Sequence, residues 1–157
     1  MTTLYQALNV HYLNNPQFES PDEFTEPYRT LLHGHDLVHL VYGVDTTLWG
    51  ENCAELITML KTDYGFWEYL GFWRTPQGRE TVQRFVKLLG VGRMFLALTY
   101  IPFATVYVLW RFRNQKGVFP FYEYIGNTQI TLEEVREKYN ITPVKPEKYR
   151  ERLFTAS

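Results

Sequence analysis

The sequence predicts an all-α protein: a single-domain helical bundle with an irregular, aromatic-rich middle. Apolar residues recur at spacings of three and four in several segments, which is the period of one buried helix face. Residues that cap helices stand directly before most of these segments. The chain has 157 residues, 45% of them hydrophobic, which allows one domain of ordinary size with a packed core.

Turn residues divide the first part of the chain into helices. A short helix from Leu4 to about Tyr12 is broken by Asn14-Asn15-Pro16. Residues 20–23 form a capping-box start, and Glu26-Pro27 restarts the helix. The next helix spans 28–42 and stops at Gly43, and the one after it, capped by residues 45–47, runs from Leu48 to about Thr62.

The second part begins with the irregular aromatic stretch 64–73, which Gly65, Gly71 and Gly78 punctuate. Thr75-Pro76 opens a helix that ends at Gly90 or Gly92, with an inner face formed by Val82, Phe85, Val86 and Leu89. Residues 118–124 are expected to be extended, and a capping box at 131–134 opens a last helix that ends near Asn140. We expect a domain over 1–142 and a charged, loosely attached tail over 143–157.

The 17 residues from Met94 to Trp110 carry no charge. A membrane-spanning helix needs about 20 apolar residues, and about 17 is the lower limit. Arginines flank the segment and Pro102 interrupts it, which disfavours an unbroken span. We therefore expect a buried core helix or a shallow helix facing a membrane, rather than a spanning one.

Composition excludes several classes of protein. The net charge of −1 argues against a nucleic-acid binder, and the one cysteine, Cys53, can form neither an internal disulfide nor a cysteine-based zinc site. The charge is unevenly divided: residues 1–63 hold nine acidic and two basic residues, whereas residues 64–157 hold eight acidic and 14 basic ones. No secretion signal is recognisable at the start, so a cytoplasmic location is expected.

The chemistry is concentrated between His33 and Glu51. His35 and His39 are one helical turn apart and point the same way, with Asp36 about 100° round the helix. If the next helix returns antiparallel after Gly43, Glu51 faces the same point. Two imidazoles and two carboxylates suit Zn²⁺, Fe²⁺ or Mn²⁺, and Mg²⁺ with more oxygen ligands. Glu55, one turn beyond Glu51, is expected to support the site as a neighbour of the ligands or to serve as a further ligand.

Other interpretations of these residues stay open. The histidines can form a polar patch at a helix C-terminus, where the helix dipole favours them. The zincin motif His-Glu-x-x-His is a near miss, because Asp36 stands where that motif has Glu. A His-Asp metal phosphohydrolase would use His11 and Asp63 with the doublet, but it leaves His39 and Glu51 without a role.

The pattern His35-Asp36-x-x-His39, then eleven intervening residues, then Glu51, resembles the hallmark of the ubiquinone (coenzyme Q) biosynthesis family called Coq-four. The surrounding HDLVHLVYGVDTTLWGE resembles that family as well, and the similarity extends from about Phe24 to Ile141. The mitochondrial presequence of eukaryotic members is absent, which suggests a bacterial member or a mature fragment.

The resemblance implies a helical protein, peripheral on the inner face of a membrane, that works with other quinone-biosynthesis enzymes. It implies oxidative decarboxylation at ring carbon 1 of a polyprenylated hydroxybenzoate, a lyase activity. The implied metal ligands are His35, Asp36, His39 and Glu51, and Zn²⁺ is preferred over Fe, Mn or Mg. A non-catalytic, prenyl-lipid-binding scaffold is the alternative, and a homo-oligomer is left open.

A polyprenyl tail needs a long apolar groove, because each buried CH₂ contributes about 0.8 kcal/mol. Side chains of the aromatic stretch and of the uncharged segment can line one, and basic residues nearby can hold a headgroup. The candidates for lipid or substrate binding are Phe66, Trp67, Phe72, Trp73, Arg93 and Phe95.

Overall fold

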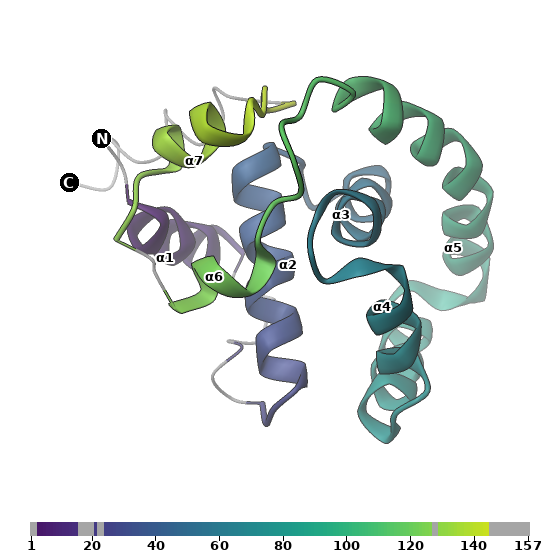
Figure 1. Ribbon diagram of the computed structural model, residues 1–157. Coiled ribbons are helices and arrows are strands. Elements are labelled where there is room, and N and C mark those ends of the chain that lie inside the picture. Colours follow the sequence, from purple (N-terminus) through teal and green to yellow (C-terminus); the bar gives the residue numbers. More distant parts are fainter. Residues whose placement is uncertain (1–2, 16–20, 22–23, 127–128, 145–157) are drawn as a thin grey trace.

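The computed structural model describes residues 3–15, 21, 24–126 and 129–144, and across these the chain is helical, with isolated bridges but no strand. The all-α prediction is confirmed. Figure 1 shows α2 near the centre, with α5 curving along the edge beyond α3. The helices are α1 (Leu4–Asn14), α2 (Tyr28–Tyr42), α3 (Leu48–Lys61), α4 (Gly65–Trp73), α5 (Pro76–Arg111), α6 (Phe121–Gly126) and α7 (Leu132–Tyr139).

Threonines cap four of these helices. Thr47 and Thr75 each accept a hydrogen bond from the backbone three residues on, at Gly50 and Gly78, as the sequence predicts. The capping box of Thr131 is also confirmed, and Thr3 forms another. The start predicted at residues 20–23 lies largely outside the described residues, as does most of the predicted tail.

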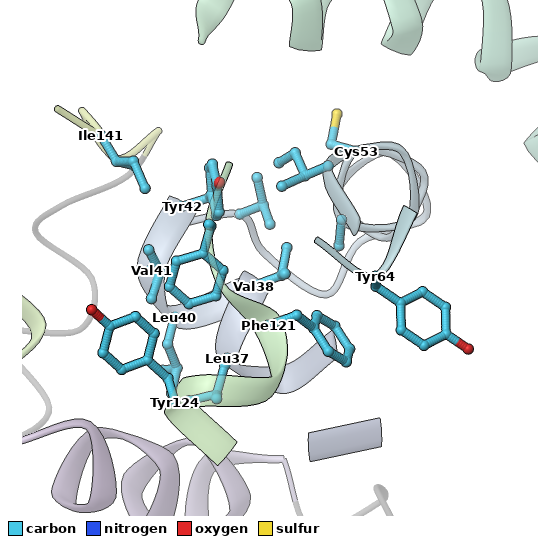
Figure 2. Close-up of a cluster of buried hydrophobic side chains, with 14 of the residues drawn as sticks. Leu37, Val38, Leu40, Val41, Tyr42, Cys53, Tyr64, Phe121, Tyr124 and Ile141 are labelled. Carbon is cyan, nitrogen blue, oxygen red and sulfur yellow. The ribbon is translucent and has the colours of Figure 1, made fainter. Parts of the chain in front are cut away.

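Helix α2 supplies the centre of the core. Its last six residues, 37–42, are all buried, and the rings of Phe121 and Tyr124 on α6 pack against this segment (Figure 2). Gly34 allows the close approach, because a Cβ there would overlap the Phe121 ring. The C-terminal carbonyls of α2 are satisfied from α7, since the Arg136 guanidinium donates to the carbonyls of Leu40 (2.7 Å) and Val41 (2.9 Å).

The aromatic stretch is helical, so the predicted irregular middle is wrong. Gly65 has a positive φ of 73° and turns the chain into α4, but Gly71 lies inside the helix with open space around it. Tyr69 and Phe72, three residues apart, are buried on one face, and the Phe72 ring stacks on Tyr28 at 5.4 Å. Packing of this face stabilises a helix that the glycines alone would disfavour.

The extended segment predicted over 118–124 is correct only in its first part. Phe119 bridges to the end of α3: its N–H donates to Lys61 (2.8 Å) and its carbonyl accepts from Asp63 (3.1 Å). Helix α6 then begins at Phe121, whose backbone N–H donates to the Asp63 carboxylate at 2.6 Å. A cap that is distant in sequence starts this helix, so local pattern does not reveal it.

Helix α5 joins two predicted helices. Its backbone leaves helical geometry at Gly90 (φ 76°), where the sequence predicts a stop, and then continues as a helix through Pro102. Within 94–110 only Ala104 and Val108 are buried, so the interpretation as a buried core helix is wrong. The segment packs on α3 along one stripe, and the described chain places no helix over its other side.

Candidate metal centre

Three side chains from α2 and α3 converge on one point. His35 Nε2 lies 3.3 Å from Glu51 Oε2, His39 Nε2 lies 3.5 Å from the same oxygen, and the two Nε2 atoms are 3.0 Å apart. Their side chains are 16%, 2% and 35% exposed for His35, His39 and Glu51. The antiparallel return predicted after Gly43 therefore exists, and among the described residues these three can hold a metal ion.

The spacing of the three atoms fits a metal ion. A tetrahedral ion with bonds of about 2.0–2.2 Å holds its ligand atoms about 3.3–3.6 Å apart. An octahedral ion with similar bonds holds adjacent ligands about 2.8–3.1 Å apart. The observed distances between the three donor atoms, 3.0–3.5 Å, are within the span of the octahedral and tetrahedral values together. Three protein ligands leave at least one coordination position for water or substrate, which is the arrangement of catalytic zinc sites.

The short connection between α2 and α3 sets this geometry. Gly43 ends α2 in the left-handed conformation, with a φ of 65° that favours glycine. Thr47 then caps α3, and its hydroxyl donates to the Asp45 carboxylate at 2.6 Å. As a result, Glu51 stands in the first turn of α3, opposite the last two turns of α2.

The same connection fixes the His39 ring. His39 Nδ1 lies 3.1 Å from the Val44 carbonyl oxygen, which can only accept a hydrogen bond. The proton of a neutral imidazole is therefore on Nδ1, and the lone pair of Nε2 faces Glu51 and His35. A backbone carbonyl on the far nitrogen is a common feature of metal-binding histidines.

The cluster concentrates opposite charges in a partly buried place. Burial opposes charge on His35, yet the carboxylates of Glu55, Glu51 and Asp36 outweigh it and raise the pKa of His35 to about 9. Burial also opposes charge on Glu51, but the imidazoles of His35 and His39 beside it hold the pKa of that carboxyl well below its ordinary range. Negative potential at two imidazoles is the environment that attracts a cation.

Glu55 acts electrostatically on two residues at the cluster. It is the main carboxylate acting on His35. Burial, and after it the Glu55 carboxylate, raise the pKa of Tyr69, so that phenol stays protonated. Glu55 therefore adds negative charge beside the cluster.

Asp36 is not brought into the three-ligand cluster. Its carboxylate accepts a hydrogen bond from the Tyr12 hydroxyl at 2.8 Å and lies 3.9 Å from His11 Nε2. The offset of about 100° from His35 turns it toward α1 instead of α3. Tyr12 was not predicted as a site residue, and His11 had a predicted role only in the phosphohydrolase alternative. His11 is buried, its ring stacks on His39 at 6.0 Å, and burial lowers the pKa of His11.

The arrangement that a His-Asp phosphohydrolase needs is not formed by the described residues. Asp63, the distant carboxylate of that interpretation, accepts the backbone N–H of Phe121 and belongs to the start of α6. It is not among the side chains that can share an ion with His35 and His39.

The residues predicted to bind lipid are divided between the core and the surface. Phe72 is buried, with its ring stacked on that of Tyr28, and Trp73 is half-buried. The others are exposed, on α4 and on the second half of α5: Phe66, Trp67, Arg93 and Phe95.

No protein-family model, curated protein or solved structure matches this chain. The site is therefore interpreted from its own geometry and from the sequence pattern.

Gly50→Ala is expected to weaken metal binding, because Gly50 packs against the backbone carbonyl of Asp45 and a Cβ would overlap it. The first turn of α3 must then shift, carrying Glu51 with it. Overpacking of this kind costs about 1–3 kcal/mol. A Zn²⁺ titration against a competing chelator, with thermal unfolding, measures both effects.

Gly71→Ala is the matched control for this prediction, because a Cβ there meets nothing within 4 Å. It should leave metal affinity unchanged and be neutral or slightly stabilising, since alanine favours a helix interior. Equal metal affinity for both alanine variants would contradict a positioning role for Gly50.

Proposed function

We propose that this protein is a metal-dependent protein of quinone biosynthesis that acts on the ring carboxylate of a polyprenylated hydroxybenzoate. The observation that carries the proposal is the cluster of His35, His39 and Glu51, with its three donor atoms at metal-ligand spacing. The resemblance of residues 35–51 to the Coq-four pattern supplies the substrate class.

The donor set suits an anionic substrate. Two neutral imidazoles and one carboxylate contribute a single negative charge, so a bound divalent ion keeps a net positive charge. Held by His35, His39 and Glu51, such an ion would supply Lewis-acid chemistry, which polarises a carboxylate or phenolate oxygen and stabilises negative charge as carbon dioxide leaves.

The protein's own residues orient and charge the site. The Val44 carbonyl fixes the His39 tautomer, and the Tyr12 hydroxyl holds Asp36 behind the histidines. Glu51 is the most exposed of the three ligand side chains, so the substrate is expected to approach from its side. Glu55, whose charge acts on His35, is a further carboxylate that can accept or return a proton.

A turnover assay tests the proposal. Replacing the ring carboxylate by a hydroxyl releases carbon dioxide, takes one oxygen atom from water and frees two electrons, so the assay mixture contains dioxygen, which accepts the two electrons and two protons and becomes hydrogen peroxide. The metal-loaded protein is incubated with a polyprenylated 4-hydroxybenzoate labelled in the carboxylate, and released carbon dioxide is counted. Glu51→Gln should reduce release to background, whereas Glu133→Gln, an exposed change on α7, should leave it intact.

A non-catalytic scaffold is the second candidate, and the exposed aromatic side chains of α4 and α5 favour it. In that case the protein retains prenyl lipid and the metal orders α2 against α3. Lipid retained without any release of carbon dioxide, by protein that contains metal, would select the scaffold.

A further inference from the structure

The second half of α5 has an apolar outer face that nothing in the described chain covers. The helix 90–111 is long and apolar enough to cross a membrane, yet only 11% of the span is buried. Phe95, Phe103 and Trp110 are 66%, 69% and 61% exposed, and they fall on the side opposite Ala104 and Val108. An exposed apolar surface of this kind marks an interaction site.

The charged side chains along this part of the chain have one sign. From residue 81 to residue 122 the chain contains no Asp or Glu and six basic residues. Arg93 precedes the apolar stretch, and Arg113 and Lys116 follow it, all exposed. The Arg113 guanidinium lies over the Trp110 ring at 5.1 Å, so a cation and an interfacial aromatic share one end of the face.

This charge pattern decides between two occupants. A second copy docking through the same face in a two-fold dimer would bring like charges together without an acidic partner. An anionic lipid surface instead offers phosphates to the cations and hydrocarbon to the apolar side chains.

The inner side of the helix decides its orientation. Ala104 and Val108 are fully buried, and Trp49 of α3 contacts the rings of Tyr100 (5.7 Å) and Tyr107 (5.8 Å). A spanning orientation would remove this side from α3 and leave both helices without their packing. Lying flat keeps these contacts and exposes only the outer face to lipid.

We propose that the outer face of residues 91–110 lies in the plane of an anionic membrane surface, with its apolar side chains below the headgroups and the flanking cations on the phosphates. Trp49, which packs on the inner side, is two residues before Glu51. Docking therefore places the metal cluster one helix away from the lipid. The inference is independent of the proposed activity, because none of its residues ligates the metal.

Flotation of the full chain with vesicles tests the proposal, with and without metal. Vesicles of equimolar phosphatidylcholine and phosphatidylglycerol should bind at least about tenfold more protein than pure phosphatidylcholine vesicles. The double variant Phe103→Glu/Val106→Glu should abolish binding, and Arg93→Gln/Lys116→Gln should weaken it roughly tenfold to thirtyfold. Leu13→Glu, an equally exposed apolar-to-acidic change on α1, is the control and should bind normally.

Depth is measured with a dye on Phe103→Cys, since Cys53 is buried. Quenchers near the headgroups should be more effective than quenchers at the bilayer centre. Equal binding to neutral and anionic vesicles, or quenching strongest at the centre, would overturn the proposal. If the protein did not bind vesicles but formed a dimer, and the double variant Phe103→Glu/Val106→Glu dissociated that dimer, a second copy would cover the face and the membrane proposal would be wrong.

Discussion

His39→Ala is expected to abolish metal binding. The wild-type chain should contain about one divalent ion after metal loading, and the variant close to none. Losing a hydrogen-bond partner of a ligand commonly costs tenfold to a hundredfold in metal affinity, so losing the ligand itself should cost more than about a hundredfold. Elemental analysis after gel filtration and a chelator-competition titration give the stoichiometry and the affinity.

The same experiment separates a metal centre from a hydrogen-bonded polar patch. Bound metal at a hundred times its dissociation constant stabilises the folded state by about 2.7 kcal/mol, so Zn²⁺ should raise the melting temperature of the wild type but not of the variant. Because His39 is buried, its replacement can also destabilise the fold. His35 is a more exposed ligand, so His35→Ala repeats the test with a smaller effect on stability. His33→Ala, on the same helix but outside the cluster, should bind metal normally. If Zn²⁺ did not change the melting temperature of the wild-type chain, the proposed metal centre would be wrong.

Phe121→Ala is expected to destabilise the fold by about 3–5 kcal/mol. Its ring is fully buried between Gly34 of α2 and Tyr64, whose ring centroid lies 5.0 Å away. Removing it leaves a cavity under α6 that the neighbouring helices cannot close. Denaturant unfolding followed by circular dichroism measures the change, and Phe103→Ala, at an exposed phenylalanine, should stay within about 0.5 kcal/mol of wild type.

Gly34→Ala reports on the same contact from the other side. In the wild-type chain the added methyl overlaps the Phe121 ring and should cost about 1–3 kcal/mol. In the Phe121→Ala background the methyl enters the vacated space, so it should cost almost nothing. Additive costs in the double variant would contradict the packing of α2 on α6.

Features that depend on near neighbours in sequence were predictable. The turn between His35 and His39, the stop at Gly43 and the caps at Thr47, Thr75 and Thr131 each involve residues within four positions of one another. Glu51 could be placed as well, because a connection this short forces α3 to return beside α2.

Features that depend on partners distant in sequence could not be predicted from the sequence. Asp36 turns to Tyr12 because α1, 24 residues earlier, lies on that side of α2. The start of α6 needs the carboxylate of Asp63, 58 residues before it. Helix α4 forms despite its glycines because the side chains of Tyr69 and Phe72 are buried against the rest of the protein.

The sequence by itself determined α1, α2, α3 and α7, the caps at Thr47, Thr75 and Thr131, and the two histidines and one glutamate that share a point. The tertiary structure alone decided what each helix faces. Periodicity gives the sides of a helix, whereas burial depends on whether another helix is there to cover a side. For residues 91–110 the sequence offers apolar side chains all round, and α3 covers only one stripe of them.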